Sequence, residues 1–429
     1  MQVLVFGVTT YTRQNDYSTE VMPMSDTSDP STFPGPLNGL RVLDLSTVYA
    51  GPFAATMLGD LGADVLKVEL PGVGDSLRSL PPHKGEIPLW WKVTNRNKRG
   101  ITIDFHREEG RLLLARLLPH YDVLVENFRP GKLDSWGITK AWMHGINPKL
   151  TILRVTGFGQ TGPYSHRPGF ARVFEAMTGF TNICGEADGP PLHLGFPIAD
   201  AVAGLFGAVG VLAALYQRHT DGTLKGEEID CSLMESMFRI MEFLPIEYDQ
   251  LGIVRQRSGS FSQYAAPGNI YKTRDGKWAS IAASTQSIFE RLCRALGRAD
   301  LITDERFLSN PVRVENRQLL DALIRDEIAK YTVDELGAML DENEVGFSPI
   351  YDIADIFKDP HFAARQALIE VPDGELGKVR MQNVAPVFVN SPGAVRSAGP
   401  SIGQHNDEVL TALGLSHEEI ASLKEAGVI

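Results

Sequence analysis

The sequence predicts an α/β fold with a parallel, doubly wound sheet, followed by a smaller α+β region. From about residue 40 to residue 155, short apolar segments typical of buried strands alternate with amphipathic segments of helical period. This alternation ends near residue 251, beyond which shorter helices and two strands around a turn are expected. The chain has 429 residues, of which 43% are hydrophobic and 22% charged, so its composition is that of a globular protein of two or three domains.

The first part of the predicted sheet can be followed element by element. Strands are expected at 40–45, 63–69, 101–105, 122–126 and 150–155, with helices at 50–61, 107–118 and 131–144. Strand, helix and strand in succession form a βαβ unit, which makes the strands parallel. Ligands of such sheets bind beyond the carboxyl ends of the strands. The loops expected to hold functional residues are therefore 47–52, 70–75, 127–131 and 156–163.

The second part of the chain begins with a long apolar segment. Residues 201–217 carry no charge, but glycines interrupt them and they fall short of the roughly 20 residues needed to span a bilayer, so they predict a buried core helix. A strand at 226–232 and a helix at 233–251 follow. The smaller region is expected to contain strands at 268–271 and 278–282 and helices near 286–296, 315–330 and 333–343, and the tail two helices at 406–413 and 417–426.

Charge and cysteine content argue against several classes of function. With 53 acidic and 41 basic residues, the formal charge is −12, so neither nucleic acid nor a membrane is an expected partner. Cys184, Cys231 and Cys293 are few and widely spaced, and the histidines are scattered, so no disulfide framework and no metal site are expected. Residues 1–36 are expected to form a disordered leader without a secretory signal, and the location to be cytoplasmic.

A glycine-rich loop follows the expected strand at 150–155. Gly157, Gly159 and Gly162 match the GxGxxG spacing of dinucleotide-binding loops. Such a loop should open a helix in the first βαβ unit, whereas here Pro163 follows at once in a later unit. We therefore expect no NAD site. The loop is either a tight turn after a strand or a backbone-lined wall of a substrate pocket, since glycine permits close approach.

Two clusters of cations occur beside expected strands. Asn95–Gly100 places three cations in four positions, and Asn127–Lys132 adds two more. Either cluster alone is compatible with a solvated charged loop. Together with Lys67, they could instead hold a phosphorylated ligand, because Arg presents a planar fork to phosphate oxygens and Lys a point charge. The N–H groups that begin the helix after Tyr49 could add further phosphate contacts.

Asp200 stands at the head of the apolar helix, next to Ala199 and Ala201. As an N-cap it would accept backbone N–H bonds, and that role alone explains an aspartate there. A second interpretation is equally open at this point. A carboxylate with small neighbours has an unobstructed approach to a carbonyl carbon and can act as a nucleophile.

Several segments in a fixed order carry a resemblance to a known family. They are Leu37–Ser46, Ala50–Phe53, Leu58–Glu69, Asn97–Arg99, Val125–Gly131, Thr156–Pro163, Asp200 in its small-residue setting, and Gly403–Leu410. In these segments the chain resembles the class III CoA-transferases, the family that includes formyl-CoA transferase, carnitine CoA-transferase and the α-methylacyl-CoA racemases. The resemblance extends over about residues 37–429.

The resemblance implies a Rossmann-like large domain with a parallel sheet, a smaller α+β domain, and an interlocked homodimer. We accordingly expect a leader at 1–36, a large CoA-binding domain at 37–225, a linker strand and helix at 226–254, a small domain at 255–370, and a C-terminal segment at 371–429 that returns to the large domain. It also implies that Asp200 is the catalytic nucleophile. The CoA contacts that it implies are Tyr49, Ala50, Lys98, Arg99, Asn127, Phe128 and Arg129.

The implied activity is transfer of CoA from an acyl-CoA, for example succinyl-CoA, to a free carboxylic acid through an aspartyl-CoA thioester. CoA is then a substrate, and neither NAD nor a metal is needed. Racemases of the family carry a His-Asp pair where this chain has Phe170-Ala171, which cannot transfer protons. Formyl-CoA transferase has Gln in place of Tyr49, so formyl and oxalate are not expected substrates. An acyl-CoA racemase or epimerase, and a catalytically silent CoA-binding protein lacking an acid at Ala171, remain the alternatives.

Overall fold

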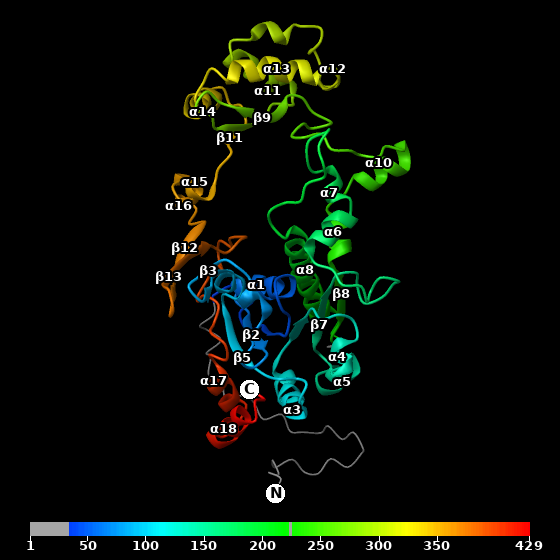
Figure 1. Cartoon of the computed structure of the whole chain (residues 1–429), viewed down its shortest axis with the longest axis vertical. Coiled ribbons are helices and arrows are strands. Elements are labelled where there is room, and N and C mark those ends of the chain that lie inside the picture. The colour runs from blue at the N-terminus through cyan, green and yellow to red at the C-terminus, as the bar shows by residue number, and fades with distance from the viewer. Residues whose placement is uncertain (1–33, 223–224) are drawn as a thin grey trace. The chain divides into compact units, whose positions relative to one another are not determined.

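The computed structural model describes residues 34–222 and 225–429, which form two compact units (Figure 1). Of the described residues, the large unit contains those from Pro34 to Phe174 together with those of Phe196–Ile240 and Leu368–Ile429. The small unit contains Glu175–Gly195 and Met241–Ala367. The predicted disordered leader lies outside the described residues except for its last three positions.

Six parallel strands form the central sheet of the large unit. They are β1 (Arg41–Asp44), β2 (Asp64–Glu69), β5 (Lys98–Thr102), β6 (Val123–Glu126), β7 (Thr151–Thr156) and β8 (Glu228–Ser232). Their order is β5-β2-β1-β6-β7-β8, which is the doubly wound order of Rossmann folds, and every neighbouring pair is parallel. The predicted fold class is thus confirmed. The order reverses between β1 and β6, so ligands are expected beyond the ends of these two strands.

Helices cover both faces of this sheet. They are α1 (Ala50–Asp60), α2 (Leu89–Thr94), α3 (Glu108–Leu117), α4 (Lys132–Ser135), α5 (Lys140–Ile146), α8 (Ile198–Asp221), α9 (Leu233–Arg239), α17 (Asn406–Ala412) and α18 (His417–Glu425). On one face, α1 and α8 pack side by side (Figure 1). On the other, α3, α17 and α18 share a core with the strands, including Leu43, Leu114 and Val409, all fully buried. The C-terminal segment therefore completes the large unit.

Several predicted elements end or begin elsewhere than expected, and three of them show why. The helix expected at 131–144 is two helices, α4 and α5, because the chain turns at Gly137, which has a φ of 81°. The helix expected at 233–251 is also divided into α9 and α10 (Leu244–Leu251), and Pro245 lies in the first turn of α10. The strand expected at 101–105 begins earlier, at Lys98. This charged residue fits into a strand because its side chain is buried and pairs with the carboxylate of Asp44.

The small unit is built on a three-stranded antiparallel sheet. Its order is β11-β10-β9, from β11 (Phe347–Pro349), β10 (Trp278–Ala282) and β9 (Gly268–Lys272). Tyr271, Ile281 and Phe289 are core residues of this unit. Its helices are α7 (Phe180–Ile183), α10, α11 (Gln286–Ala295), α12 (Asn310–Glu315), α13 (Arg317–Ile328), α14 (Val333–Glu342), α15 (Ile353–Ile356) and α16 (Pro360–Ala364). Between the units in sequence lies α6 (Ala171–Met177), and hairpins β3–β4 (His83–Lys84, Ile87–Pro88) and β12–β13 (Leu368–Asp373, Gly377–Gln382) belong to the large unit.

The apolar helix expected at 201–217 is α8. In the described part of the chain it alone is long and apolar enough to cross a membrane by length and composition, and half of its apolar window is buried within the structure. Ala203 and Gly207 face the interior, whereas Leu205, Val209 and Tyr216 are exposed. One side of α8 is therefore part of the core and the other is an apolar surface.

Candidate active site

The loops that follow β1 and β6 are joined by one side chain. Asn127 accepts a hydrogen bond from the Thr47 N–H at 2.7 Å and donates one to the Thr47 carbonyl at 2.6 Å. Gly51 allows this loop to fold tightly, because a Cβ there would lie 2.4 Å from the Cβ of Ser46. Asn127, predicted as a CoA contact, thus holds the β1 loop in place at the edge of the sheet where a ligand is expected.

Tyr49 ends the β1 loop and caps α1. Its ring is 7% exposed and packs against three aromatic rings, with centroid distances of 5.3 Å to Phe53, 5.5 Å to Trp90 and 6.0 Å to Phe196. Ala50, the next predicted contact, is buried as the first residue of α1. Sequence reasoning missed Trp90 and Phe196, since nothing in their local pattern links them to Tyr49.

Asp200 lies in the first turn of α8, three residues after the N-cap, which is Pro197. The interpretation of Asp200 as the N-cap is therefore wrong, because α8 starts earlier than the apolar run suggested. Asp200 is half-buried, and its place in the first turn puts it at the positive end of the helix dipole. Burial, and then the negative charge of Asp200, raise the pKa of Tyr49 to about 12. The structure thus brings these two predicted residues together, with a neutral phenol at neutral pH.

Gly204 explains how α8, which carries Asp200, packs so closely on α1, which follows Tyr49. One turn after Asp200, a Cβ at this position would lie 2.8 Å from the carbonyl oxygen of Ala50 and 2.8 Å from Cδ1 of Phe53. The backbones of α8 and α1 approach each other only because this side chain is missing. The glycine that interrupts the apolar run therefore positions the site.

Gly204→Ala is expected to lower kcat by about tenfold or more, because the added methyl moves α8, and with it Asp200, away from α1. The matched control is Gly210→Ala on the same helix, where a Cβ would meet only Ile229, at 3.2 Å. Both changes gain about 1 kcal/mol of helix propensity. Steady-state kinetics check the prediction, and equal activities of the two variants would contradict it.

A fully buried charge cluster lies behind the β1 loop. The ammonium group of Lys67 is 3.2 Å from the carboxylate of Asp75 and 3.9 Å from that of Asp44, and it also donates to the carbonyl of Ser46. The ammonium of Lys98 is 2.9 Å from the other oxygen of Asp44. Burial opposes the charge on Asp44, but Lys67 and Lys98 outweigh it and lower the pKa of this carboxyl.

This cluster determines the backbone of the loop that carries Tyr49. The N–H of Val48 donates to Asp75 at 2.9 Å, and Val48 has a φ of 66°, a left-handed conformation that β-branched residues rarely adopt. Lys67 and Asp75 are therefore positioning residues. The interpretation of Lys67 as a phosphate ligand is wrong, because carboxylates surround it in the interior. The signal that could have shown this is a lysine within the apolar strand Val65–Val68.

The remaining predicted cations differ in exposure. Lys98 is buried and donates to Asp44, to the Pro52 carbonyl at 2.8 Å and to Asn95 at 2.9 Å, and burial lowers its pKa to about 8. Arg99 pairs with Asp64 at 2.8 Å and Glu408 at 2.9 Å. Both side chains have partners within the large unit, and their contact with CoA stays a prediction.

Arg129 differs from both of these cations. It is exposed at the carboxyl end of β6, and its side chain makes no ion pair within the described residues. The preceding residue, Phe128, is half-buried, and its ring packs on Trp136 at 5.4 Å. Arg129 is thus the predicted cation best placed to meet a phosphate from solvent.

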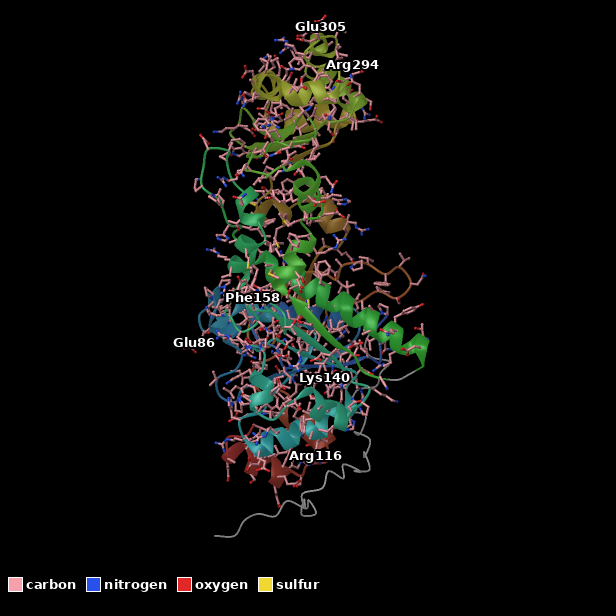
Figure 2. The ribbon with its side chains drawn as sticks, turned by 90° about the vertical axis from the view of Figure 1, so that its right-hand side faces the viewer. Glu86, Arg116, Lys140, Phe158, Arg294 and Glu305 are labelled. Carbon is pink, nitrogen blue, oxygen red and sulfur yellow. The ribbon has the colours of Figure 1, made fainter. Side chains whose placement is uncertain are left out.

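Glu126, at the end of β6, holds the start of this loop. Its carboxylate accepts from the Phe128 N–H at 2.7 Å and lies 3.3 Å from Arg154. Arg154 also pairs with Glu228 at 2.7 Å, which pairs with Lys140 (labelled in Figure 2) at 2.8 Å. Burial raises the pKa of Glu126 from 4.5 to about 7, although Arg154 opposes this shift.

The raised pKa of Glu126 predicts a pH dependence of stability. Between pH 4.5 and about 7 the folded chain keeps a proton that the unfolded chain loses, so this stabilisation is full below pH 4.5 and is lost as pH rises through 7. The free energy of unfolding of the wild type should therefore fall by roughly 3 kcal/mol relative to Glu126→Gln over this range. Urea unfolding from pH 4.5 to 8 tests this. If the free energy of unfolding of the wild type instead rose with pH relative to that of Glu126→Gln, Arg154 would be keeping Glu126 ionised.

The glycine-rich loop after β7 has a packing explanation. A Cβ at Gly157 would lie 2.4 Å from the ring of Phe174, and Gly159 and Gly162 have φ values of 86° and 89°. The Phe158 ring (labelled in Figure 2) also packs on Phe174, with centroids 4.9 Å apart. No helix opens from this loop, since α6 begins at Ala171. These glycines make a tight turn after a strand, as one of the two interpretations held.

Comparison with known proteins assigns the family. Residues 37–406 match the model of CoA-transferase family III. The chain belongs to CoA-transferase family III. This membership confirms the resemblance found in the sequence, and it makes the protein an enzyme of the class III CoA-transferase type.

Relatives within CoA-transferase family III match over nearly their whole length. A succinyl-CoA–D-citramalate CoA-transferase of Chloroflexus aurantiacus is 44% identical, with 92% of this chain and 98% of that protein covered. The beta subunit of a succinyl-CoA–L-malate CoA-transferase of the same organism is 41% identical, over 94% of this chain and 100% of that subunit. The crystal structure of a CaiB/BaiF family protein from Brucella suis superimposes with a TM-score of 0.79 at 35% identity, covering 89% of this chain and 100% of that one.

Proposed function

We propose that this class III CoA-transferase moves CoA from succinyl-CoA to a dicarboxylic acid related to malate or citramalate. The observation that carries the proposal is that Asp200, half-buried in the first turn of α8, acts electrostatically on the buried Tyr49, which is the N-cap of α1 beyond the carboxyl end of β1. The donor and the class of acceptor come from the names of the two Chloroflexus relatives.

In the first half of the reaction, the Asp200 carboxylate attacks the thioester carbon of succinyl-CoA. The C–S bond breaks, CoA leaves as a thiolate, and a mixed anhydride of Asp200 and succinate remains. The thiolate then attacks the carbonyl carbon of Asp200, the C–O bond to the succinyl group breaks, and succinate leaves. Asp200 now carries CoA as a thioester.

In the second half, a carboxylate of the acceptor repeats the exchange. It attacks the Asp200 thioester and releases the thiolate, which attacks the acceptor's carbon of the new anhydride and frees Asp200. No step adds or removes a proton. This chemistry therefore has no need for a general base at Phe170-Ala171, of which Phe170 is 75% exposed and Ala171 is buried.

Tyr49 and the start of α8 have complementary roles in these steps. Each attack on a carbonyl carbon places negative charge on its oxygen, and donors aimed at that oxygen lower the barrier. With a pKa of about 12, the Tyr49 hydroxyl keeps its proton at neutral pH and can donate it in a hydrogen bond. The backbone N–H groups in the first turn of α8 supply further positive potential near Asp200.

The racemase alternative needs two acid/base groups facing the α-carbon. Neither Phe170 nor Ala171 has a titratable side chain, so that alternative has weaker support. In the alternative of a catalytically silent CoA-binding protein, Asp200 takes part in no reaction. The electrostatic coupling of Asp200 to Tyr49 gives this alternative weaker support. A panel of carboxylic acids incubated with succinyl-CoA and followed by mass spectrometry decides among the three, since each gives a different product: a new thioester, an α-deuterated acyl-CoA in D2O, or nothing.

For CoA itself we propose contacts with Tyr49, Ala50, Asn127, Phe128 and Arg129. Contacts of Lys98 and Arg99 with CoA have weaker support, because both side chains already pair with carboxylates. Arg129→Ala is expected to raise KM for succinyl-CoA about tenfold with little change in kcat, because one charge-assisted hydrogen bond to a phosphate is lost. Arg365→Ala removes another exposed arginine and should leave KM unchanged. An unchanged KM in the Arg129 variant would remove this residue from the CoA site.

We further propose a cytoplasmic homodimer, with the two chains interlocked and the domain boundaries as given above. The exposed apolar side of α8, represented by Leu205, Val209 and Tyr216, supports burial against a second chain. A dimer would have twice the chain's mass of 47.1 kDa, which light scattering measures directly.

A further inference from the structure

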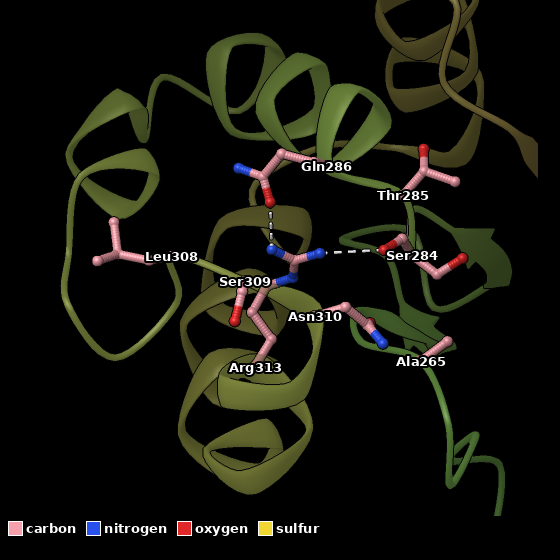
Figure 3. A pocket seen from close by; sticks show the side chains of 8 residues that line it. All are labelled: Ala265, Ser284, Thr285, Gln286, Leu308, Ser309, Asn310 and Arg313. Carbon is pink, nitrogen blue, oxygen red and sulfur yellow. Dashed lines mark hydrogen bonds between the residues drawn. The ribbon is translucent and has the colours of Figure 1, made fainter.

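A cavity of about 470 Å³ opens on the small unit, between the start of α11 and the start of α12 (Figure 3). Eight residues line it: Ala265, Ser284, Thr285, Gln286, Leu308, Ser309, Asn310 and Arg313. Most of these side chains are polar or small, and Arg313 is the one charged residue among them. None of them is used by the proposed transfer reaction.

Arg313 is fully buried, and all its hydrogen-bond partners are neutral. Its Nε donates to the Ala266 carbonyl at 2.8 Å, Nη1 to the Phe307 carbonyl at 3.1 Å and to the Gln286 side chain at 2.7 Å, and Nη2 to the Ser284 carbonyl at 3.0 Å. The last two bonds are drawn in Figure 3. A guanidinium has five N–H groups, and these four bonds leave the second N–H of Nη2 available for a further acceptor.

The charge of Arg313 lacks a counter-charge. No carboxylate within the described residues pairs with it, and burial lowers its pKa while Cys293 opposes the shift. That thiol is itself neutral, because burial raises the pKa of Cys293 to about 12. Arginine stays protonated in proteins. The ring of Phe289 lies beneath the guanidinium, with its centroid 4.4 Å from the central carbon, and provides a cation–π contact. A buried cation is normally also paired with an anion, and within the described residues Arg313 has none.

Gln286 covers Arg313 from the solvent side. Its side chain is exposed, and its Oε1 accepts from Arg313 while its Nε2 donates to Glu290 at 3.2 Å. Glu290 is held in turn by Arg294 at 2.9 Å. A neutral, exposed amide oxygen thus occupies the place on the guanidinium that an anionic oxygen would fill more favourably.

The surroundings of Gln286 also favour an anion. Gln286 begins α11, a helix of ten residues whose N-cap is Thr285. The Thr285 hydroxyl accepts from the Ile288 N–H at 3.4 Å, and the positive end of the helix dipole lies at the cavity. The hydroxyls of Ser284 and Ser309 are further donors on the lining. Buried guanidinium, helix N-terminus and hydroxyls converge on one opening.

We propose that this cavity binds an oxyanion, either a phosphate or a carboxylate group, which displaces the Gln286 amide and pairs with Arg313. This proposal does not depend on the proposed transfer reaction. The bound anion would supply the missing counter-charge and would stabilise the small unit. It would do so on a protein whose formal charge is −12, through a local site rather than a general attraction.

Thermal unfolding of the full chain tests the proposal with inorganic phosphate and acetate as separate probes, each against chloride at equal ionic strength. We expect at least one of the two to raise the melting temperature by about 2–4 °C. Hydrogen exchange should slow in the peptide that contains the start of α11. The probe that acts identifies the anion as phosphate or carboxylate.

The decisive variant is Gln286→Glu, which places a tethered carboxylate on Arg313. Without added anion it should melt at a higher temperature than Gln318→Glu, and phosphate or acetate should no longer stabilise it. Gln318 is the matched control, because it is also an exposed glutamine in the first turn of a helix, α13, with an acidic residue, Asp321, shortly after it. Gln318→Glu should keep the full anion response.

Three outcomes would overturn the proposal. They are the absence of any effect of phosphate and acetate beyond that of chloride, an undiminished response in Gln286→Glu, and a melting temperature of Gln286→Glu at or below that of Gln318→Glu. Each outcome would mean that Arg313 has a structural role alone, which is to hold the surrounding loops through its hydrogen bonds. Because the readouts are stability and exchange at α11, loss of the proposed enzymatic activity would not mimic any of them.

Discussion

Asp200→Ala is expected to lower kcat/KM for CoA transfer by about 10⁴-fold or more, because the variant has no group to carry the acyl and CoA intermediates. The fold should persist, since Asp200 is half-buried and is not the cap of α8. Binding of CoA, measured by calorimetry, should be nearly unchanged. Transfer activity is followed by mass spectrometry of the thioester products.

Two further variants separate a nucleophile from a structural charge. Asp200→Asn keeps the shape and should be as inactive as Asp200→Ala, because an amide oxygen is a poor nucleophile. Asp326→Asn makes the same chemical change at an exposed position of α13 and should retain full activity. Turnover in Asp200→Asn within tenfold of the wild type would contradict the assignment.

Lys67→Met is expected to destabilise the protein by about 3–5 kcal/mol, the second largest effect. The change leaves the carboxylate of Asp75 buried without its cation, and Asp44 with Lys98 alone. The loop that carries Tyr49 should loosen as well, because Lys67 and Asp75 both hold it. Urea unfolding measures the free energy of unfolding. A lowered kcat would report that the loop no longer holds Tyr49 in position.

A double variant tests whether the charges act as a pair. Lys67→Met with Asp75→Asn should recover part of the stability lost in Lys67→Met, because the uncompensated carboxylate is gone. Lys378→Met removes a lysine from an exposed pair with Glu370, 2.9 Å apart, and should cost less than about 1 kcal/mol. Equal losses for Lys67→Met and Lys378→Met would mean that the buried cluster does not support the fold.

The alternation of apolar strands and amphipathic helices was sufficient to predict the parallel sheet. Burial on both faces makes such strands continuously apolar, and this signal is local. Breaks within helices were harder to predict, because the turn at Gly137 and the start of α10 at Leu244, just before Pro245, depend on single residues within apolar patterns. The start of β5 at Lys98 was missed because a charged residue in a strand requires a buried partner, Asp44, that lies 54 positions away in sequence.

In the candidate site, too, some residues could be predicted from the sequence and others could not. Tyr49 and Asn127 follow the ends of strands and Asp200 lies in the first turn of a helix, which are positions that the motifs and the topology indicate. In the structure, Asn127 holds the loop that leads to Tyr49, and Asp200 acts electrostatically on Tyr49. The roles of Lys67 and Lys98 could not be predicted from a cluster of cations. Whether a lysine meets solvent or a carboxylate depends on tertiary contacts, and both of these meet Asp44 in the interior.

The central claim is that Asp200 carries CoA during the reaction, and peptide mass spectrometry tests it most directly. In D2O, the protein is incubated with succinyl-CoA, with succinyl-CoA and an acceptor acid, or with a 2-methylacyl-CoA. Each sample is quenched in acid, digested and analysed together with its small molecules. We predict a CoA adduct on the peptide that contains Asp200, lost on addition of an acceptor acid such as malate as a new thioester forms. No adduct on that peptide, with deuterium at the α-carbon of an added 2-methylacyl-CoA, would contradict the account and indicate a racemase.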